Sequence, residues 1–166
     1  MIKTRIIFAA LGIVLLSACA GHTPAPVEER EIEARVRTPA RQDSEGVQVY
    51  GLQNPAVVQL TQDARRAENA GDLDQAAVLL ERALRINPRD PQIMQQMAEI
   101  QLQKQDYEQA LNFAIRSYDI GPRVGEICAR NWRTIGVARD YLDDSRGAQE
   151  AERRAGQCMN TRPQGL

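Results

Sequence analysis

Apolar and polar positions divide the chain into three parts with different patterns. Residues 6–16 are apolar without interruption, whereas residues 20–54 are rich in charge and proline. From residue 57 onward, apolar residues recur at spacings of three and four, which is the pattern of one helix face. We therefore predict an apolar leader, a polar connecting segment and a helical domain. Two of the helical stripes are Val57, Leu60 and Ala64, and Ala76, Leu80, Ala83 and Leu84.

The helical part repeats every 34 residues. Gly-Asp-Leu-Asp-Gln-Ala at 71–76 returns as Gln-Asp-Tyr-Glu-Gln-Ala at 105–110. Each period contains two signals for the start of a helix, so each period predicts a helix hairpin. Hairpins of this length stack into arrays in which each unit buries its apolar face against its neighbours. The expected N-caps are Asp72 and Asp106, each with Gln three residues later, and Asn54 and Asp90, each followed by Pro.

These hairpins resemble the tetratricopeptide repeat. The third unit matches its first-helix pattern best, with Trp132-x-x-Ile135-Gly136. That unit also contains about four extra residues near 123–127. The resemblance implies an all-α fold, a solenoid of three helix hairpins over residues 55–160 with a tail at 161–166. Small residues fill the family's close-crossing positions: Ala64, Ala76 and Ala83; Ala98, Ala110 and Ser117; Gly147, Ala148 and Ala155.

The apolar leader predicts a targeting signal. Its eleven residues are too few to cross a bilayer, which takes about 20, but they suit the core of a secretory signal. Leu16-Ser17-Ala18-Cys19 resembles the lipobox of bacterial lipoproteins. This resemblance implies a signal peptide at 1–18 and lipidation of Cys19, and Ala20 after it favours the outer membrane, facing the periplasm. The alternative is an ordinary cleaved signal with an incidental Cys.

Residues 19–54 are expected to be the lipidated Cys and a flexible periplasmic tether, because they contain too few apolar residues to offset the entropy of ordering. The alternative over 28–37 is a transient helix, with Glu31–Arg35 and Glu33–Arg37 as favourable pairs. The strip Val47–Leu52 is interpreted either as packing on the first helix of the domain or as a partner-binding epitope.

Composition argues against an enzyme. The chain has one His, seven aromatic residues and a net charge of -1. It has no His in the domain to act as a general base and no glycine-rich phosphate loop. The adjacent acids Asp143 and Asp144 are expected to cap a helix. We therefore expect no catalysis, cofactor, metal site, small-molecule substrate or nucleic-acid partner.

Two cysteines are left once Cys19 carries lipid. Cys128 and Cys158 fall at the start of one expected helix and the end of its antiparallel partner. In an oxidising compartment this pairing predicts a disulfide. The alternative is two free, buried thiols.

The expected function is protein binding. Repeats of this family offer a concave face built from their first helices. Transfer of the family pattern gives Arg65, Glu99, Arg130, Arg133 and Tyr141 as partner-binding residues, flanked by Thr61, Glu68, Gln95, Leu102 and Val137. The alternative for each of them is a solvated helix face.

The anchor, tether and small repeat domain together resemble the outer-membrane tetratricopeptide lipoproteins that activate bifunctional peptidoglycan synthases (penicillin-binding proteins). This resemblance implies a periplasmic protein partner, a peptidoglycan synthase, and an outer-membrane attachment through lipid. The alternative is a pilotin-like lipoprotein that assists assembly of a secretin or a type IV pilus component; a passive structural role is a third reading.

Overall fold

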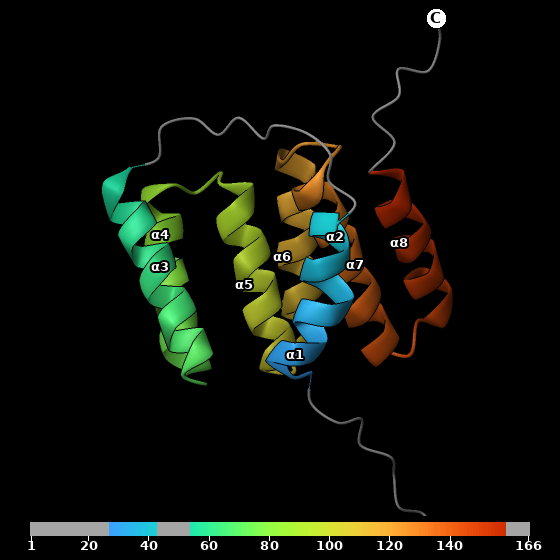
Figure 1. The fold of residues 1–166 in the computed structure, drawn as a ribbon, viewed down its shortest axis with the longest axis horizontal. Coiled ribbons are helices and arrows are strands. Elements are labelled where there is room, and N and C mark those ends of the chain that lie inside the picture. The colour runs from blue at the N-terminus through green and yellow to red at the C-terminus, as the bar shows by residue number, and fades with distance from the viewer. Residues whose placement is uncertain (1–26, 43–53, 159–166) are drawn as a thin grey trace, which may run out of the picture.

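The computed structural model describes residues 27–42 and 54–158, and the secondary structure in these two ranges is entirely helical (Figure 1). The predicted all-α fold class is confirmed. Cys19, the leader and the strip Val47–Leu52 lie outside the described residues, as do 159–166.

Three helix hairpins stand side by side along the molecule, in chain order (Figure 1). Within each hairpin the two helices pack along their length, and α4 and α6 contact the first helix of the next hairpin. The helices are α3 (Pro55–Asn69) with α4 (Leu73–Ile86), α5 (Pro91–Gln103) with α6 (Tyr107–Ile120), and α7 (Glu126–Tyr141) with α8 (Ser145–Gln157).

The N-caps predicted from sequence are confirmed. Asp72, Asp106 and Asp144 each accept a hydrogen bond from the backbone N–H three residues later, at 2.8–3.1 Å. Asn54 and Asp90 accept from the N–H two residues later, at 2.9 Å in both cases. These oxygens satisfy N–H groups that have no partner inside the helix, which explains why the helices start there.

Small residues allow the helices to cross closely. The small residues expected at the close crossings of the first two hairpins are fully buried. They are Ala64, Ala76 and Ala83 in the first hairpin and Ala98, Ala110 and Ser117 in the second. In the third hairpin a side chain on Gly136 would stand 3.5 Å from both the Ala151 Cβ and the Ala148 carbonyl oxygen. The hairpins therefore pack around side chains of minimal size.

The insertion expected near 123–127 is divided between a connection and a helix. Five residues separate α6 from α7, against four between α4 and α5. The other three lengthen α7, which has 16 residues against 13 in α5.

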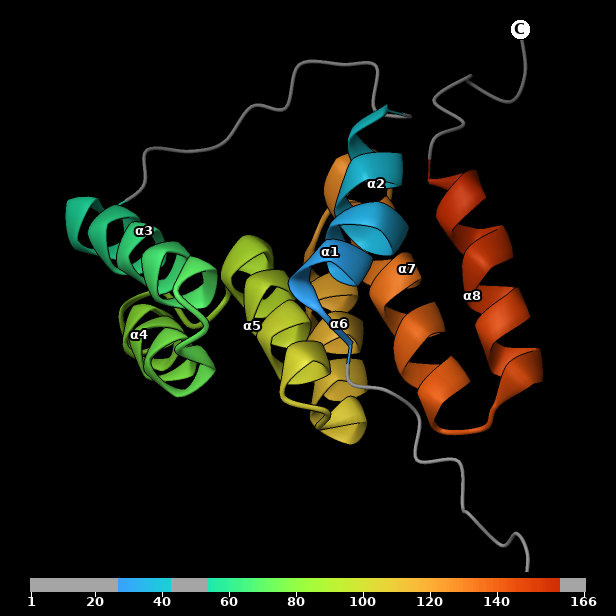
Figure 2. The same ribbon diagram turned by 60° about the horizontal axis from the view of Figure 1, so that its bottom comes forward.

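One further helix comes from the segment expected to be a flexible tether. It is formed by α1 (Glu29–Ile32), a wide π-helical turn η1 (Glu33–Arg37) and α2 (Thr38–Gln42), which are continuous. We call residues 29–42 the N-terminal helix. It contacts α7, and in both views it lies in front of the repeats between α5 and α7 (Figures 1 and 2). The expectation of a flexible chain is therefore wrong for these residues, because they bury apolar side chains against the repeats.

The wide turn has a local cause. Pro39 lacks an N–H and its ring would crowd the carbonyl of Arg35 in a regular helix. In the structure the Thr38 N–H bonds instead to the Glu33 carbonyl, five residues back. The extra residue in that turn accommodates the proline without ending the helix.

Candidate functional site

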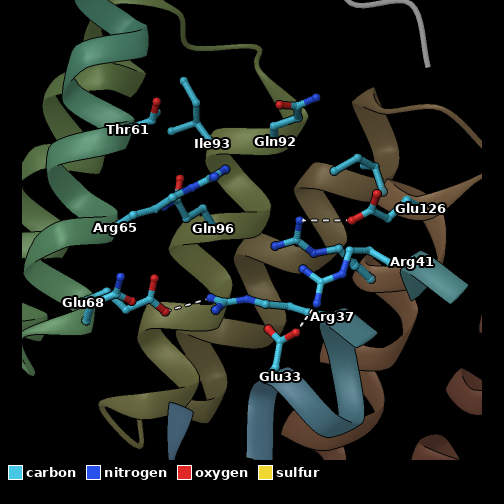
Figure 3. A pocket seen from close by; sticks show the side chains of 13 residues that line it. Glu33, Arg37, Arg41, Thr61, Arg65, Glu68, Gln92, Ile93, Gln96 and Glu126 are labelled. Atoms are coloured by element: carbon cyan, nitrogen blue, oxygen red, sulfur yellow. Dashed lines mark hydrogen bonds and ion pairs between the residues drawn. The ribbon is translucent and has the colours of Figure 1, made fainter. Parts of the chain in front are cut away.

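The first helices of the three hairpins line one face of the repeats, which we call the groove. The N-terminal helix lies in the groove, and a cavity of about 400 Å³ remains between it and these helices (Figure 3). The lining of this cavity is mostly charged and polar. It consists of Thr61, Arg65, Glu68 and Asn69 from α3; Gln92, Ile93 and Gln96 from α5; Glu126, Ile127 and Arg130 from α7; and Glu33, Arg37 and Arg41 from the N-terminal helix.

Arg37 ties the N-terminal helix to the repeats. Its guanidinium donates from Nη2 to Glu68 Oε1 and from Nε to Glu99 Oε2, each at 2.7 Å, and also pairs with Glu29. The Glu99 side chain is fully buried and that of Glu68 is 2% exposed. Burial lowers the pKa of Arg37, but the Glu99 and Glu68 carboxylates outweigh it and raise that pKa. Arg37 therefore stays charged, and Figure 3 shows its contact with Glu68.

Glu99 stays ionised despite its burial. Arg130 donates to its Oε1 at 2.6 and 3.0 Å, and Gln95 donates to the same oxygen at 3.0 Å. Burial raises the pKa of this carboxyl, but Arg130 and Arg37 reverse the effect and lower it overall. A buried charge with several donors is expected to hold its site in one geometry.

Glu29 differs from Glu99 in that its pKa is raised. Gln103 Nε2 donates to Glu29 Oε2 at 2.7 Å and to Glu68 Oε1 at 2.6 Å, so the two acids lie close together. Burial raises the pKa of Glu29 to about 7, helped by its hydrogen bond with Glu68 and opposed by Arg37. The carboxyls that pair with Arg37 and Arg130 outnumber these two guanidiniums, since Glu126 also lies 3.8 Å from Arg130, so a proton on Glu29 reduces the excess of negative charge.

Apolar contacts complete the docking of the N-terminal helix. Ile32, Val36 and Ala40 are each 0% exposed. In a regular helix, residues spaced by four drift around the axis, and the extra residue in η1 offsets that drift. The three side chains therefore share one face. Ile32 and Val36 pack in a cluster with Leu102, Ala110, Val137 and Ala138, and Ala40 packs with Cys128, Ala129 and Cys158.

Several residues predicted to form the concave face do line the groove, namely Thr61, Arg65, Glu68 and Arg130. Arg65 is exposed, and no ion pair is found for it within residues 27–42 and 54–158. It is thus available to a ligand entering the groove.

The other predicted residues are already engaged. Glu99 is buried under Arg37. Tyr141 stacks on Tyr107 with ring centres 4.7 Å apart, and its hydroxyl lies 3.2 Å from Glu31 Oε2. Arg133 does not line the groove; its Nη1 donates to Glu152 at 2.8 Å. Leu102 and Val137 are buried beneath the N-terminal helix. A role for Glu99, Arg133 and Tyr141 in partner binding stays a prediction.

The N-terminal helix, which borders the cavity opposite the repeats, was not predicted as part of the site. Of the two ion pairs expected in the N-terminal helix, Glu31–Arg35 is present at 2.7 Å. Glu33–Arg37 is wrong, because Glu33 pairs with Arg41 and accepts from Thr38 Oγ1. The useful signal was the apolar spacing of four from Ile32 to Ala40. Gln92, Gln96 and Glu126 were also missed, although they lie on the helices expected to line the face.

Cys128 and Cys158 join the two ends of the third hairpin. Their sulfurs lie 2.04 Å apart, at bonding distance, and their Cα atoms 5.7 Å apart. The bond would close a loop over a sequence separation of 30. It lies beside Ala40, so the end of the N-terminal helix packs where the third hairpin is closed.

Within the two described ranges, no helix has the length and apolar character that crossing a membrane demands. A family model of the tetratricopeptide repeat matches residues 69–116. Among solved structures, the globular C-terminal domain of LpoP from P. aeruginosa is similar, with 34% identity and a TM-score of 0.60. The match covers 63% of this chain and 99% of the LpoP domain. A comparison with curated proteins finds no match.

Proposed function

Since this chain belongs to the tetratricopeptide-repeat family, we propose that it is a non-catalytic scaffold that binds and activates a peptidoglycan synthase in the periplasm. The observation that carries the proposal is the likeness to the LpoP domain over nearly its whole length. That likeness favours a synthase over the secretin or pilus component of a pilotin-like role.

The groove is the proposed contact surface. Its walls are the first helices of all three hairpins, so a partner seated there touches every repeat at once. Arg65 supplies an exposed guanidinium, and arginine is favoured at the energetic centres of protein interfaces. A mixed-charge groove selects its partner by charge complementarity as well as by shape.

Attachment to the outer membrane through Cys19 is part of the proposal and rests on the likeness of Leu16–Cys19 to the lipobox. Activation then requires only that the scaffold has different affinities for the active and resting forms of the synthase. A scaffold that binds the active form of the synthase more tightly than the resting form shifts the population toward activity. No residue of the scaffold has to take part in the chemistry.

Crosslinking in intact cells tests the partner. The lipidated protein is crosslinked and captured, and the attached proteins are identified by mass spectrometry. We expect a peptidoglycan synthase. Recovery of a secretin without a synthase would reject the synthase and support the pilotin-like role.

A charge reversal tests the surface. Arg65→Glu places an acid on the groove wall and should reduce crosslinking about tenfold or more, since hot-spot residues contribute about 2 kcal/mol or more. The matched control is Arg82→Glu, an exposed position on α4, which does not line the groove. Equal recovery from both variants would remove the groove from the proposal.

A further inference from the structure

The N-terminal helix occupies the groove in the way a bound ligand would. It presents one apolar face, formed by Ile32, Val36 and Ala40, and one inserted guanidinium, Arg37. All four come from outside the repeats, and the repeats supply the complementary surface. The helix is therefore a template for what this surface recognises.

We infer that the N-terminal helix is an internal competitor for the groove, and that the partner binds by displacing it with a helix of its own that carries an apolar face and an inserted arginine. The inference rests on the proposed function for the existence of a protein partner. It adds the kind of element that the partner presents and the state of the groove before binding.

The chemistry of recognition follows from what the helix now covers. Without Arg37, the carboxylates of Glu68 and Glu99 would lose their cation from the N-terminal helix, leaving Arg130 as the cation bonded to Glu99. We call this pair of carboxylates the acidic socket. Two carboxylates about one guanidinium apart are well matched to the fork of donors on arginine. A partner lacking arginine would leave the socket desolvated and under-paired.

The apolar part of the surface imposes a second requirement. Leu102 and Val137, now 0% and 4% exposed, would face water if the N-terminal helix left. Burying an aliphatic side chain contributes roughly 1.5–3 kcal/mol relative to exposing it, so an apolar strip on the partner is favoured. An amphipathic helix in a groove meets both requirements with anchors on one face.

The N-terminal helix is also built to be displaceable. It spans only residues 29–42, and an isolated helix of that length is marginal in water. A π-helical turn is rare, and Pro39 removes a backbone donor. Two of its three buried apolar side chains, Val36 and Ala40, are smaller than the third, Ile32. A partner helix without the wide turn and the proline would not carry these two costs.

Covalent attachment compensates for weak docking. Twelve residues separate α2 from α3, and a short connection of this kind gives an effective concentration on the order of millimolar. A modest intrinsic affinity therefore keeps the groove closed in the free protein. A partner helix must bind the groove tightly enough to displace the tethered N-terminal helix. The docked helix therefore sets the minimum affinity that a partner needs.

A labelled peptide with the sequence of residues 27–42 tests the inference on the mature chain. Val36→Glu in the chain should release the N-terminal helix, because it buries a charge in the apolar cluster. Fluorescence anisotropy should then show the peptide binding the Val36→Glu chain about tenfold or more tighter than the wild-type chain. Ala34→Glu is the matched control, since Ala34 is exposed on the same helix, and it should behave as wild type.

The arginine is tested in the peptide, where folding of the chain is not at issue. An Arg37→Met peptide should bind the opened chain about tenfold or more weakly, because the bonds to the acidic socket are charge-assisted. Arg37→Ala in the chain is a second route to an open groove without an added charge. Circular dichroism verifies that each variant keeps the repeats folded.

Three results would overturn the inference. The first is equal peptide affinity for the wild-type chain and both opened variants. The second is equal affinity of the Arg37→Met and unaltered peptides. The third is a dimer of the wild-type chain that Val36→Glu dissociates, since the helix would then occupy a second copy. The proposed function fails separately: correct peptide binding without a crosslinked synthase would reject the synthase and leave the competitor in place.

Discussion

At the scale of single residues, the cluster around Arg37 links docking to protonation. The docked state holds Glu29 beside Glu68, with a pKa near 7 against the ordinary 4.5. An undocked segment would return Glu29 to water and to its ordinary pKa. Docking therefore takes up a proton at pH values between these two pKa values.

The sign of the pH dependence follows. Because the docked pKa is the higher one, the contribution of Glu29 to docking is complete below pH 4.5 and is lost as the pH rises through 7. We expect the amides of residues 29–42 to be better protected from hydrogen exchange, relative to α5, at about pH 5.5 than at about pH 8. Glu29→Gln should largely remove this difference, and an unchanged difference in that variant would show that another group titrates.

The same residues show the limit of sequence-based prediction of the site. Thr61, Arg65, Glu68 and Arg130 could be predicted, because a repeat fixes which helix positions face inward. Arg37 could not, since it comes from outside the repeats and nothing in its neighbouring residues indicates two carboxylates from α3 and α5. Its role depends on tertiary contacts alone.

At the scale of helices and turns, the three hairpins reuse one backbone conformation. The turn between paired helices has a residue with positive φ in each repeat: Gly71 at 78°, Gln105 at 63° and Asp143 at 60°. Only glycine adopts this region without a steric cost from Cβ, which is about 1–2 kcal/mol. Gly71 therefore adopts the left-handed conformation without backbone strain, whereas Gln105 adopts it at a steric cost.

Gln105→Gly should stabilise the domain. Relief of the left-handed strain exceeds the added entropy of glycine in the unfolded chain, so we expect the free energy of unfolding to rise by about 0.5–1 kcal/mol. Urea denaturation measures it. Gln62→Gly, the same substitution at an exposed position inside α3, should instead lower it by about 1 kcal/mol. A destabilised Gln105→Gly variant would contradict the strain argument.

Helices were predictable where local signals and the period agree. Asp72 and Asp106 cap helices because the capping residue and the apolar stripe after it are both visible in sequence. The N-terminal helix lacks such agreement, since no side chain caps it at Glu28 and its composition is polar. Packing on the repeats stabilises it, and packing is not visible in a local pattern.

At the scale of the whole molecule, the third hairpin is the last one that the structure describes, and its α8 has a strongly polar surface. Few apolar side chains hold it against α7; Ala151 and Ala155 are its fully buried ones. A covalent link between the ends of this hairpin therefore acts where few buried apolar side chains hold the two helices together.

The double variant Cys128→Ala, Cys158→Ala should lower the free energy of unfolding by about 3 kcal/mol, from the closure of a loop of this length. Denaturation with and without reductant measures it. Reductant should lower the stability of the wild-type chain by a similar amount and leave the double variant unchanged. Insensitivity of the wild-type chain would indicate two free thiols.

Docking of the N-terminal helix also limits how far the repeat domain can extend from the membrane anchor. With Cys19 held in the outer membrane as proposed, residues 20–28 alone would separate the anchor from the docked helix, a span of at most about 32 Å. Release of the helix would lengthen the connection to residues 20–54, which can extend to about 120 Å. The event that opens the groove is the one that gives the domain its reach. A target deep in the periplasm would meet an open groove, and one close to the outer membrane a closed groove.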